Sequence, residues 1–575
     1  MSFSNLLLKN LLAEPPNTVN FDKLDPKTRR AIAALEAISE FKQPTYFMWT
    51  KAWPWLETIS RGLLDQPLST VAGYDMADKF LRTVPGLLLY SISSDHRIER
   101  WELLQNVLRT PRVLSLALEL WLFASTTNHR FVQVLCNVLR MFLDFRETDT
   151  PEELLSFPKD CKAVCTNTSR WDVPTTCIKE IVRVLGQPGL DCGSLRSTLS
   201  ILLMVSRDLY IESMPRLIAM GVTRWLAIAM SKLASLRMIT GSGTSETPLE
   251  NAACCVKQIM TFMCICGRQD SYSLLDALDG GILISVYKAR TLMLTDGDLR
   301  GLETNPGPHM VEFLSILIQR LLHRAILVRV VRSVKKAEKL GFYEPEESFA
   351  PFQEFWMRLK DEALSRNSRV TLGSLPHICG FEQVLSLSLE WTRQLVLTLF
   401  VYQCANRIKK VYQRCGGCGA EVYCSADCQK AAWKTSHRKK CREHREDTRE
   451  GKRCRMPSML EIAFVHFQVY SDFSAFEIRF QELREQYFKD HPDETGAIYI
   501  QLDYSDVPPA MEVVNYEQAR KKLVWPCGAE RPFPLEASAF GLVPWRQTKS
   551  EPIVVYQMPQ QRLTQDLGES HGHAH

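Results

Sequence analysis

The sequence has no uninterrupted apolar run of the roughly 18 to 20 residues that a membrane-spanning helix needs. The best candidate, 385–401, is interrupted by Glu390 and Arg393. The first dozen residues also lack the basic, apolar and small-residue order of a secretory signal. We therefore expect a soluble protein with no membrane partner, in a reducing compartment, the cytoplasm or the nucleus, despite its 18 cysteines.

The chain has little excess charge of either sign and no catalytic motif. Its 70 Lys and Arg against 65 Asp and Glu give a formal charge of +5, too small to indicate nucleic-acid binding along the whole chain. The sequence contains no Ser-His-Asp set, phosphate-binding glycine loop or paired acid arrangement. We therefore expect a protein that is not an enzyme and whose electrostatic partners are recognised locally.

Alternating strand patterns are nearly absent before residue 402. Apolar residues instead recur at spacings of three and four between residues 68 and 401, which is typical of amphipathic helices. The sequence therefore predicts a mainly α fold. Its length of 575 residues predicts more than one structural unit. We expect an N-terminal arm or cap (1–67), a helical domain (68–403), a cysteine-rich module (404–441), a helical and α+β region (442–545) and a disordered tail (546–575).

Two stretches of the helical region share a helix-glycine-helix pattern. Residues 214–233 and 272–289 each place one glycine, Gly221 or Gly281, between two apolar segments. Glycine can adopt the left-handed conformation that lets the chain turn at a helix end. The pattern resembles the corner of armadillo-type repeats, so we expect an irregular armadillo-like array; ordinary helical hairpins are the alternative.

Other stretches predict individual elements. Residues 310–340 predict one long helix that becomes basic towards its end, which fits either a solvated face or binding to an acidic partner or membrane surface. Residues 459–487 predict a helix with a buried aromatic stripe. The first strand patterns occur at 497–504 and 511–516, so we expect a small α+β unit near the C-terminus.

The strongest functional pattern is the cysteine-rich module. Within 38 positions it holds seven residues that can bind zinc: Cys404, Cys415, Cys418, Cys424, Cys428, His437 and Cys441. Six of them form pairs with the spacings Cys-x2-Cys, Cys-x3-Cys and His-x3-Cys. Thiolate and imidazole groups at such short spacings are typical ligands of tetrahedral zinc.

The segment YCSADCQKAAWKTSHRKKC, residues 423–441, resembles the second half of a MYND-type zinc finger. The resemblance implies two zinc ions that are bound by interleaved pairs of ligands. One ion would be held by Cys415, Cys418, His437 and Cys441. Four protein ligands make a closed structural site, whereas a catalytic zinc keeps one position open for water.

The second implied site lacks one ligand. Cys424 and Cys428 would need an earlier pair of cysteines, but Cys404 has no cysteine partner at position 401 or 407. Three alternatives stay open: a three-cysteine site completed by water or a distant ligand, an empty site, or Cys404 as an ordinary buried thiol. The candidates for a distant ligand are His377, Cys379 and His444.

The resemblance also implies a protein partner. In this family the helix after the second cysteine pair contributes to a shallow groove for short proline-containing peptides, and Gln429 and Trp433 occupy the corresponding positions. Trp433 can alternatively serve as the core of a very small domain. The same helix is rich in Lys and Arg, which favours peptides with acidic flanks and leaves nucleic-acid phosphates as an alternative.

We therefore expect a zinc-binding, non-enzymatic adaptor. The alternatives are a DNA-associated transcriptional regulator and a SET-type lysine methyltransferase, a class that shares the finger. The absence of an Asn-His-Ser-Cys cofactor motif argues against the methyltransferase. Eight cysteines outside the finger are expected to be small buried thiols. They are Cys161, Cys165, Cys177, Cys192, Cys254, Cys255, Cys264 and Cys266.

Overall fold

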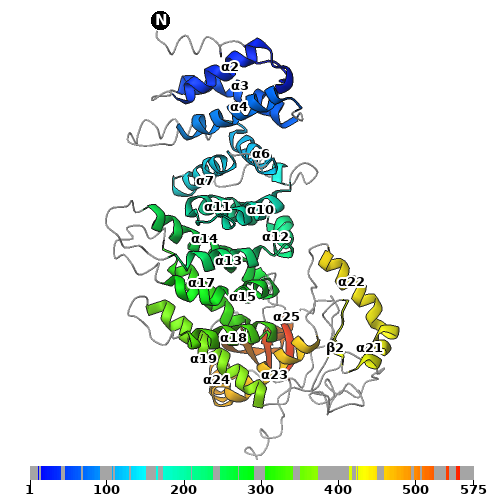
Figure 1. Cartoon of the computed structure of the whole chain (residues 1–575). Helices are drawn as coiled ribbons and strands as arrows, with labels where there is room; N and C mark the ends of the chain where they lie inside the picture. The colour runs from blue at the N-terminus through cyan, green and yellow to red at the C-terminus, as the bar shows by residue number, and fades with distance from the viewer. Residues whose placement is uncertain are drawn as a thin grey trace, which may run out of the picture. The chain divides into compact units, whose positions relative to one another are not determined.

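Figure 1 shows the structure of the chain, a computed structural model. Most of the residues that it describes are helical, which confirms the predicted mainly α class. Their contacts define two compact units, Met1–Met220 with Met238–Gln258 and Gly221–Arg237 with Ile259–His575. The described residues are 11, 14–40, 46–65, 69–90, 107, 110–127, 131–149, 163–165, 172–208, 210–236, 247–269, 271–290, 305–340, 350–372, 413–417, 422–423, 425–449, 459–493, 498–504, 508–522, 539–542 and 552–556.

The helices of the first unit pack mainly on near neighbours in the chain (Figure 1). They are α2 (Pro26–Ser39), α3 (Tyr46–Asp65), α4 (Val71–Tyr90), α6 (Val113–Thr126), α7 (Val132–Asp149), α10 (Val173–Leu185), α11 (Cys192–Asp208), α12 (Tyr210–Ala219) and the first part of α14 (Thr247–Gln269). α2 packs against α4, so the predicted N-terminal arm contacts the helices beyond residue 67. The predicted domain boundaries themselves stay predictions.

Acidic side chains fix the start of several of these helices. Asp25 accepts a hydrogen bond from the Thr28 amide (3.0 Å) at the start of α2. Asp22 holds the two residues that precede α4, although it is distant from them in sequence. Its carboxylate accepts hydrogen bonds from the amides and hydroxyls of Ser69 and Thr70, and these bonds lower the pKa of Asp22 to about 2.

The second unit also contains packed helices. Its helices include α13 (Val222–Leu233), the remainder of α14, α15 (Leu275–Asp279), α16 (Ile282–Ala289), α17 (Gly307–Arg320), α18 (Arg324–Lys339) and α19 (Ala350–Leu372). α13 packs against α15 and α16, and α18 packs against α16 and α19. Apolar side chains fill these contacts, and the sulfhydryls of Cys264 and Cys266 are buried among them.

The predicted long helix at 310–340 is wrong, because the structure breaks it into α17 and α18. His323 is extended (φ −88°, ψ 118°), and its carbonyl accepts hydrogen bonds from the amides of Ile326 and Leu327 as α18 begins. Leu321, Leu322 and His323 are all buried. The break therefore lets both helices bury their apolar faces, a tertiary requirement that the local sequence pattern does not reveal.

The basic residues of α18 lie on its solvent side, in agreement with the solvated-face alternative. Arg332, Lys335 and Lys336 are exposed. Arg329 pairs with Asp279 of α15, with 2.9 Å between nitrogen and oxygen. The alternation of buried valines with these exposed cations makes α18 strongly amphipathic.

Both predicted glycine turns are confirmed. Gly221 and Gly281 have φ angles of 76° and 83°, and they directly precede α13 and α16. Arg112 adopts the same left-handed conformation before α6 (φ 66°), and its guanidinium lies 3.1 Å from the Glu57 carboxylate. The sequence does not reveal this third turn because no glycine marks it. The armadillo-like repeat itself stays a prediction.

Replacing Gly281 by alanine tests the left-handed turn. The added Cβ would meet no atom within 4 Å, so the cost is conformational, and we expect a loss of about 1–2 kcal/mol in the free energy of unfolding. Gly189→Ala is the matched control, because its Cβ is equally uncrowded and its φ is not left-handed. Urea unfolding should leave the control within about 0.5 kcal/mol of wild type. Equal losses in both variants would contradict the prediction.

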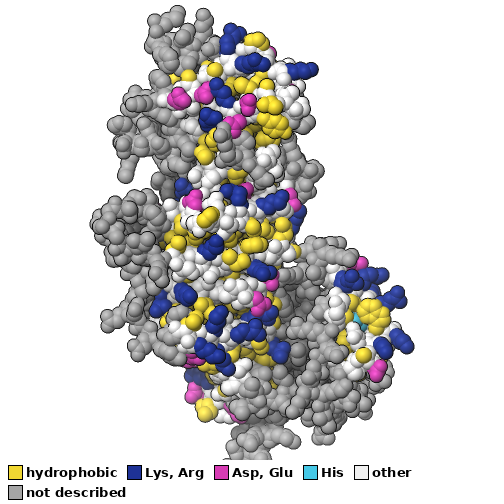
Figure 2. Space-filling view, in the orientation of Figure 1, with side chains coloured by type: hydrophobic (Ala, Val, Ile, Leu, Met, Phe, Trp, Pro, Cys, Tyr) yellow, Lys and Arg dark blue, Asp and Glu magenta, His cyan; other side chains and the backbone are white. Residues whose placement is uncertain are grey.

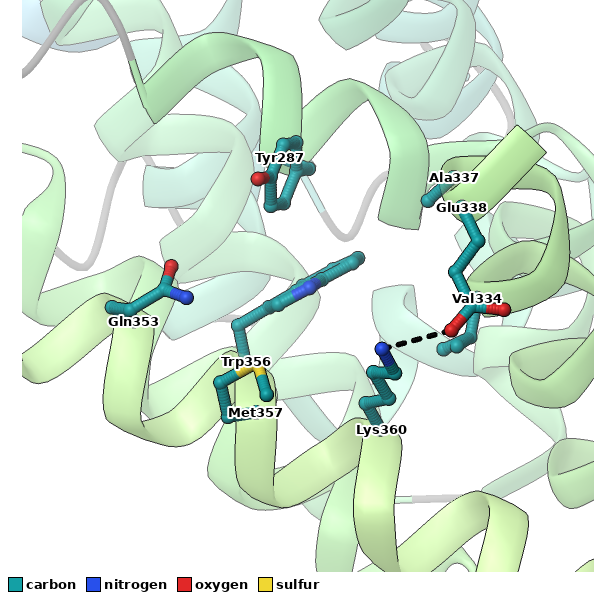
Figure 3. A pocket seen from close by; sticks show the side chains of 8 residues that line it. All are labelled: Tyr287, Val334, Ala337, Glu338, Gln353, Trp356, Met357 and Lys360. Atoms are coloured by element: carbon teal, nitrogen blue, oxygen red, sulfur yellow. Dashed lines mark ion pairs between the residues drawn. The ribbon is translucent and has the colours of Figure 1, made fainter. Parts of the chain in front are cut away.

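A small pocket lies where α16, α18 and α19 meet (Figure 3). The rings of Trp356 and Tyr287 face each other, with centroids 4.7 Å apart, and both side chains are almost fully buried. Lys360 and Glu338 form an ion pair at its edge, with 2.8 Å between Nζ and the carboxylate. The pocket is a gap in the packing of three helices, and its charged groups neutralise each other.

The predicted α+β unit at the C-terminus is confirmed. α23 (Met459–Ala475) and α24 (Glu477–Asp490), separated at Phe476, replace the single helix predicted at 459–487. The predicted strands are β3 (Ile498–Asp503) and β4 (Ala510–Asn515); α25 (Tyr516–Lys522) follows, then β5 (Ala539–Leu542) and β6 (Pro552–Tyr556). The sheet order is β4-β3-β5-β6, and only the β3 and β5 pair is parallel.

Strand β6 corrects the expectation of irregular structure after residue 546. It pairs with β5 in antiparallel fashion. Its Ile-Val-Val run consists of β-branched residues, which favour strands. The histidines at the end of the chain lie outside the described residues.

A buried ion-pair network joins α19 to this C-terminal unit. Asp472 of α23 accepts hydrogen bonds from Arg366 (3.0 Å), Arg369 (2.6 Å) and the Tyr504 hydroxyl (3.0 Å). The side chains of Arg366 and Asp472 are each only 5% exposed. Burial raises the pKa of Tyr504 well above its usual value, so this phenol stays protonated and donates to Asp472.

Neutralising Asp472 should be costly. In Asp472→Asn the buried Arg366 keeps only Glu362 as a carboxylate partner, and Arg369 loses its ion pair with Asp472. We therefore expect about 3 kcal/mol less stability in thermal or urea unfolding. Glu482→Gln is the control, since it removes an ion pair with Arg479 in which both side chains are more than half exposed. The control should lose less than about 1 kcal/mol. Similar losses in the two variants would show that burial does not determine the effect.

Candidate metal centre

A two-stranded hairpin positions the first candidate ligand. Strands β1 (Gln413–Arg414) and β2 (Val422–Tyr423) pair in antiparallel fashion. Cys415 directly follows β1, and only 3% of its surface is exposed. The hairpin therefore presents the Cys415 thiol inward. It also brings the buried ring of Tyr423 beside the helix that follows.

The other two ligands lie on one helix. It begins as α21 (Ala426–Ala432), widens into a π-helical turn, η4 (Trp433–His437), and continues as α22 (Arg438–Arg449). Ser425 caps its start, because the hydroxyl accepts a hydrogen bond from the Cys428 amide (3.2 Å). His437 and Cys441 are four residues apart and therefore share one helix face, on which both are buried.

The hairpin and the helix bring Cys415, His437 and Cys441 together. Cys415 Sγ lies 3.2 Å from His437 Nε2 and 3.9 Å from Cys441 Sγ, and the three ligand atoms all lie within 4.8 Å of one another. Tetrahedral zinc with usual bond lengths separates such atoms by about 3.5–3.8 Å. Two thiols and one imidazole at this spacing fit a zinc ion. Among the described residues, this is the one cluster of at least three such ligands.

The structure tests the remaining predicted ligands only in part. Cys404, Cys418 and Cys424 lie outside the described residues, as do the distant candidates His377 and Cys379. His444 lies on α22, but its side chain is not described. Cys428 is half-buried and does not belong to the three-residue cluster. Its assignment to a second zinc, and that of Cys418 to the first, stay predictions.

Two further residues, Gly417 and Tyr423, pack against the cluster. Neither was predicted, because neither is a metal ligand. A Cβ on Gly417 would lie 2.9 Å from Cys441 Sγ and 3.7 Å from Cys415 Sγ. The Tyr423 ring meets the His437 ring edge-on, with centroids 5.7 Å apart. A glycine inside a Cys-x2-Cys pair can indicate such a close approach, although Gly416 next to it has open space around it.

We predict that Gly417→Ala weakens zinc binding by about 10-fold or more, because the methyl group displaces the Cys441 sulfur. Competition with a chromophoric zinc chelator on the full-length chain measures this change. Gly416→Ala is the control, since its Cβ would meet nothing within 4 Å, and it should retain the wild-type affinity. Equal affinities for the two variants would contradict the close packing of Gly417 on the ligands.

The two predicted peptide-binding residues lie one helical turn apart. Trp433 is 42% exposed, so it is not a buried core residue. Its ring lies beside that of His437, with centroids 5.7 Å apart. Gln429, four residues earlier, is half-buried. The exposed indole therefore stands on a helix whose next turn carries a candidate metal ligand.

The described cysteines of the helical units do not belong to the candidate metal cluster. Cys192 is partly buried, and Cys161 lies outside the described residues. The other six of the eight predicted thiols are buried, as expected: Cys165, Cys177, Cys254, Cys255, Cys264 and Cys266. Burial also raises the pKa of Cys136 to about 12. These buried cysteines pack as small apolar side chains.

Residues 402–441 match the model of the MYND finger family. A search of curated proteins found no similar sequence. None of the described helices is long and apolar enough to cross a membrane, and residues 385–401 lie outside the described part of the chain.

Proposed function

Because the chain contains a MYND-type zinc finger, a zinc-binding module of a kind that generally mediates protein–protein interactions, we propose that it is a non-enzymatic adaptor. The finger would bind a short proline-containing segment of a partner protein. The helical units would act as the scaffold that carries it. The zinc would be held by Cys415, Cys418, His437 and Cys441.

The observation that carries the proposal is the exposed Trp433. Trp433 remains 42% exposed on a small domain, which leaves a large part of its apolar ring available for contact with a partner. Aromatic side chains are also frequent anchors in protein interfaces. An indole surface suits the flat ring of a proline, and a proline-containing segment loses little conformational entropy on binding because it is already extended.

The donor set supports a structural metal. With Cys418 as the fourth ligand, the ion would have no open position for water or substrate. The protein residues then do two things: they tie the hairpin to the helix, and they hold the Trp433 face in one orientation. Both contributions suit binding more than catalysis.

Affinity capture with the full-length chain tests this proposal. We expect Trp433→Ala to lose a set of partner proteins that the wild type retains, with an unchanged zinc content. Phe488→Ala on α24 is the control, because it removes another aromatic side chain of similar exposure (39%). The control should capture the same proteins as the wild type. Identical sets for the wild type and Trp433→Ala would overturn the proposal.

A further inference from the structure

The exposed side of the finger helix carries a row of cations. Lys430, Lys434, Arg438 and Arg442 recur every four residues and are all exposed. Figure 2 shows Lys and Arg side chains gathered over the finger helix. A spacing of four slightly exceeds the 3.6 residues of an α-helical turn, so such a row drifts around a regular helix. The wider turn of η4 falls in the middle of this row and reduces the drift. Trp433 lies within the same stretch.

The two inner cations of this row differ from the outer ones. Lys430 lies 3.9 Å from Asp427, and Arg442 lies 3.9 Å from Glu446. Lys434 and Arg438 have no ion-pair partner among the described residues. Lys434 directly follows Trp433 in η4, and Arg438 begins α22 one turn further along the helix. Within the described part of the chain, no acidic side chain neutralises these two cations.

The net positive charge of the protein is concentrated in this module. Residues 404–441 contain nine Lys and Arg but only two Asp and Glu, a net charge of +7. The whole chain carries +5, so the remaining residues sum to −2. A zinc ion with three thiolates and one imidazole lowers the charge of the finger by only one. The finger therefore attracts an anionic ligand over a long range.

We propose that the peptide that binds at Trp433 carries Asp or Glu residues beside its anchor, and that Lys434 and Arg438 bind these carboxylates. This inference rests on the proposed function, since it assigns the chemistry of the partner segment at the same surface. The indole takes the apolar or proline residue. The two cations select for acidic neighbours. Their attraction raises the association rate more than it raises the affinity.

A peptide fits this surface better than a nucleic acid does. Nonspecific binding of single strands uses several aromatic side chains that stack successive bases. On the described part of the finger, Trp433 is the one large apolar side chain that is strongly exposed. Asp427, Glu443 and Glu446 also lie on the helix and would repel a continuous phosphate backbone. A peptide with two or three carboxylates can avoid them.

A phage library of random 12-residue peptides with a central proline tests the proposal, with selection on the zinc-loaded full-length chain. Selection on Trp433→Ala identifies the sequences that depend on the indole. We expect the Trp433-dependent sequences to be enriched in Asp and Glu beside the proline. Trp433-dependent sequences without that enrichment would overturn this inference and leave the proposed function standing. No Trp433-dependent sequence at all would overturn both.

A second measurement tests whether Lys434 and Arg438 bind the carboxylates of the peptide. Fluorescence anisotropy compares the most strongly selected peptide with its Asn and Gln analogue. We expect the acidic peptide to bind about 10-fold more tightly in low salt, and this advantage to shrink as salt is raised. Lys434→Gln and Arg438→Gln should each weaken the acidic peptide about threefold and leave the analogue unchanged.

Lys439→Gln is the matched control, because Lys439 is exposed on the same helix but lies outside the four-residue row, 4.0 Å from Glu443. It should bind both peptides like the wild type. An equal loss in all three variants would mean that only the overall charge matters and would overturn the assignment. Displacement of the acidic peptide by a single-stranded oligonucleotide at a lower concentration than the unlabelled peptide would also overturn it.

Discussion

The meeting of Cys415, His437 and Cys441 is the contact on which the finger depends, since it ties the β1–β2 hairpin to the helix. A segment of about 40 residues buries too little apolar surface to fold alone. Apart from the ligands, the buried side chains of its described part are only Tyr423 and Ala432. Metal binding must therefore supply most of the folding free energy, which is on the order of 10–16 kcal/mol for structural zinc in isolated finger peptides.

The helical units depend on a different source of stability. Their interiors consist of aliphatic and aromatic side chains, and burial of apolar surface stabilises them without a metal. The Arg366–Asp472 pair is an exception inside this apolar packing. Desolvation offsets much of the attraction between two buried charges, so such a pair adds little net stability. Its hydrogen bonds, together with the one from Tyr504, tie α19 and the residue after β3 to the same carboxylate on α23.

Local patterns in the sequence predicted the local features of this structure. The spacing of His437 and Cys441 places both on one helix face, and glycine marks the turns at Gly221 and Gly281. The strand at 498–503 is equally clear from its β-branched and aromatic residues. Each of these features depends on a few adjacent residues, and that is why the sequence alone could predict it.

The remaining features depend on contacts between distant residues. Asp472 and Arg366 are 106 positions apart, and neither has a local pattern that indicates its partner. The helix ends at Leu321–His323, where three buried residues separate two helices that each bury an apolar face. Arg112 takes a left-handed turn without a glycine. In the finger, the approach of Gly417 to Cys441 joins two segments that the sequence separates by 23 residues.

His437 links the candidate metal centre to the exposed ring of Trp433. Its Nε2 faces Cys415, and its ring packs between the buried Tyr423 and the exposed Trp433. The orientation that a zinc ion requires of the imidazole therefore also limits the positions that the indole can adopt. A peptide that uses this indole meets a surface that is already ordered, so little free energy is lost to ordering on binding. By linkage, if bound zinc raises the affinity for such a peptide by a given factor, the bound peptide raises the affinity for zinc by the same factor.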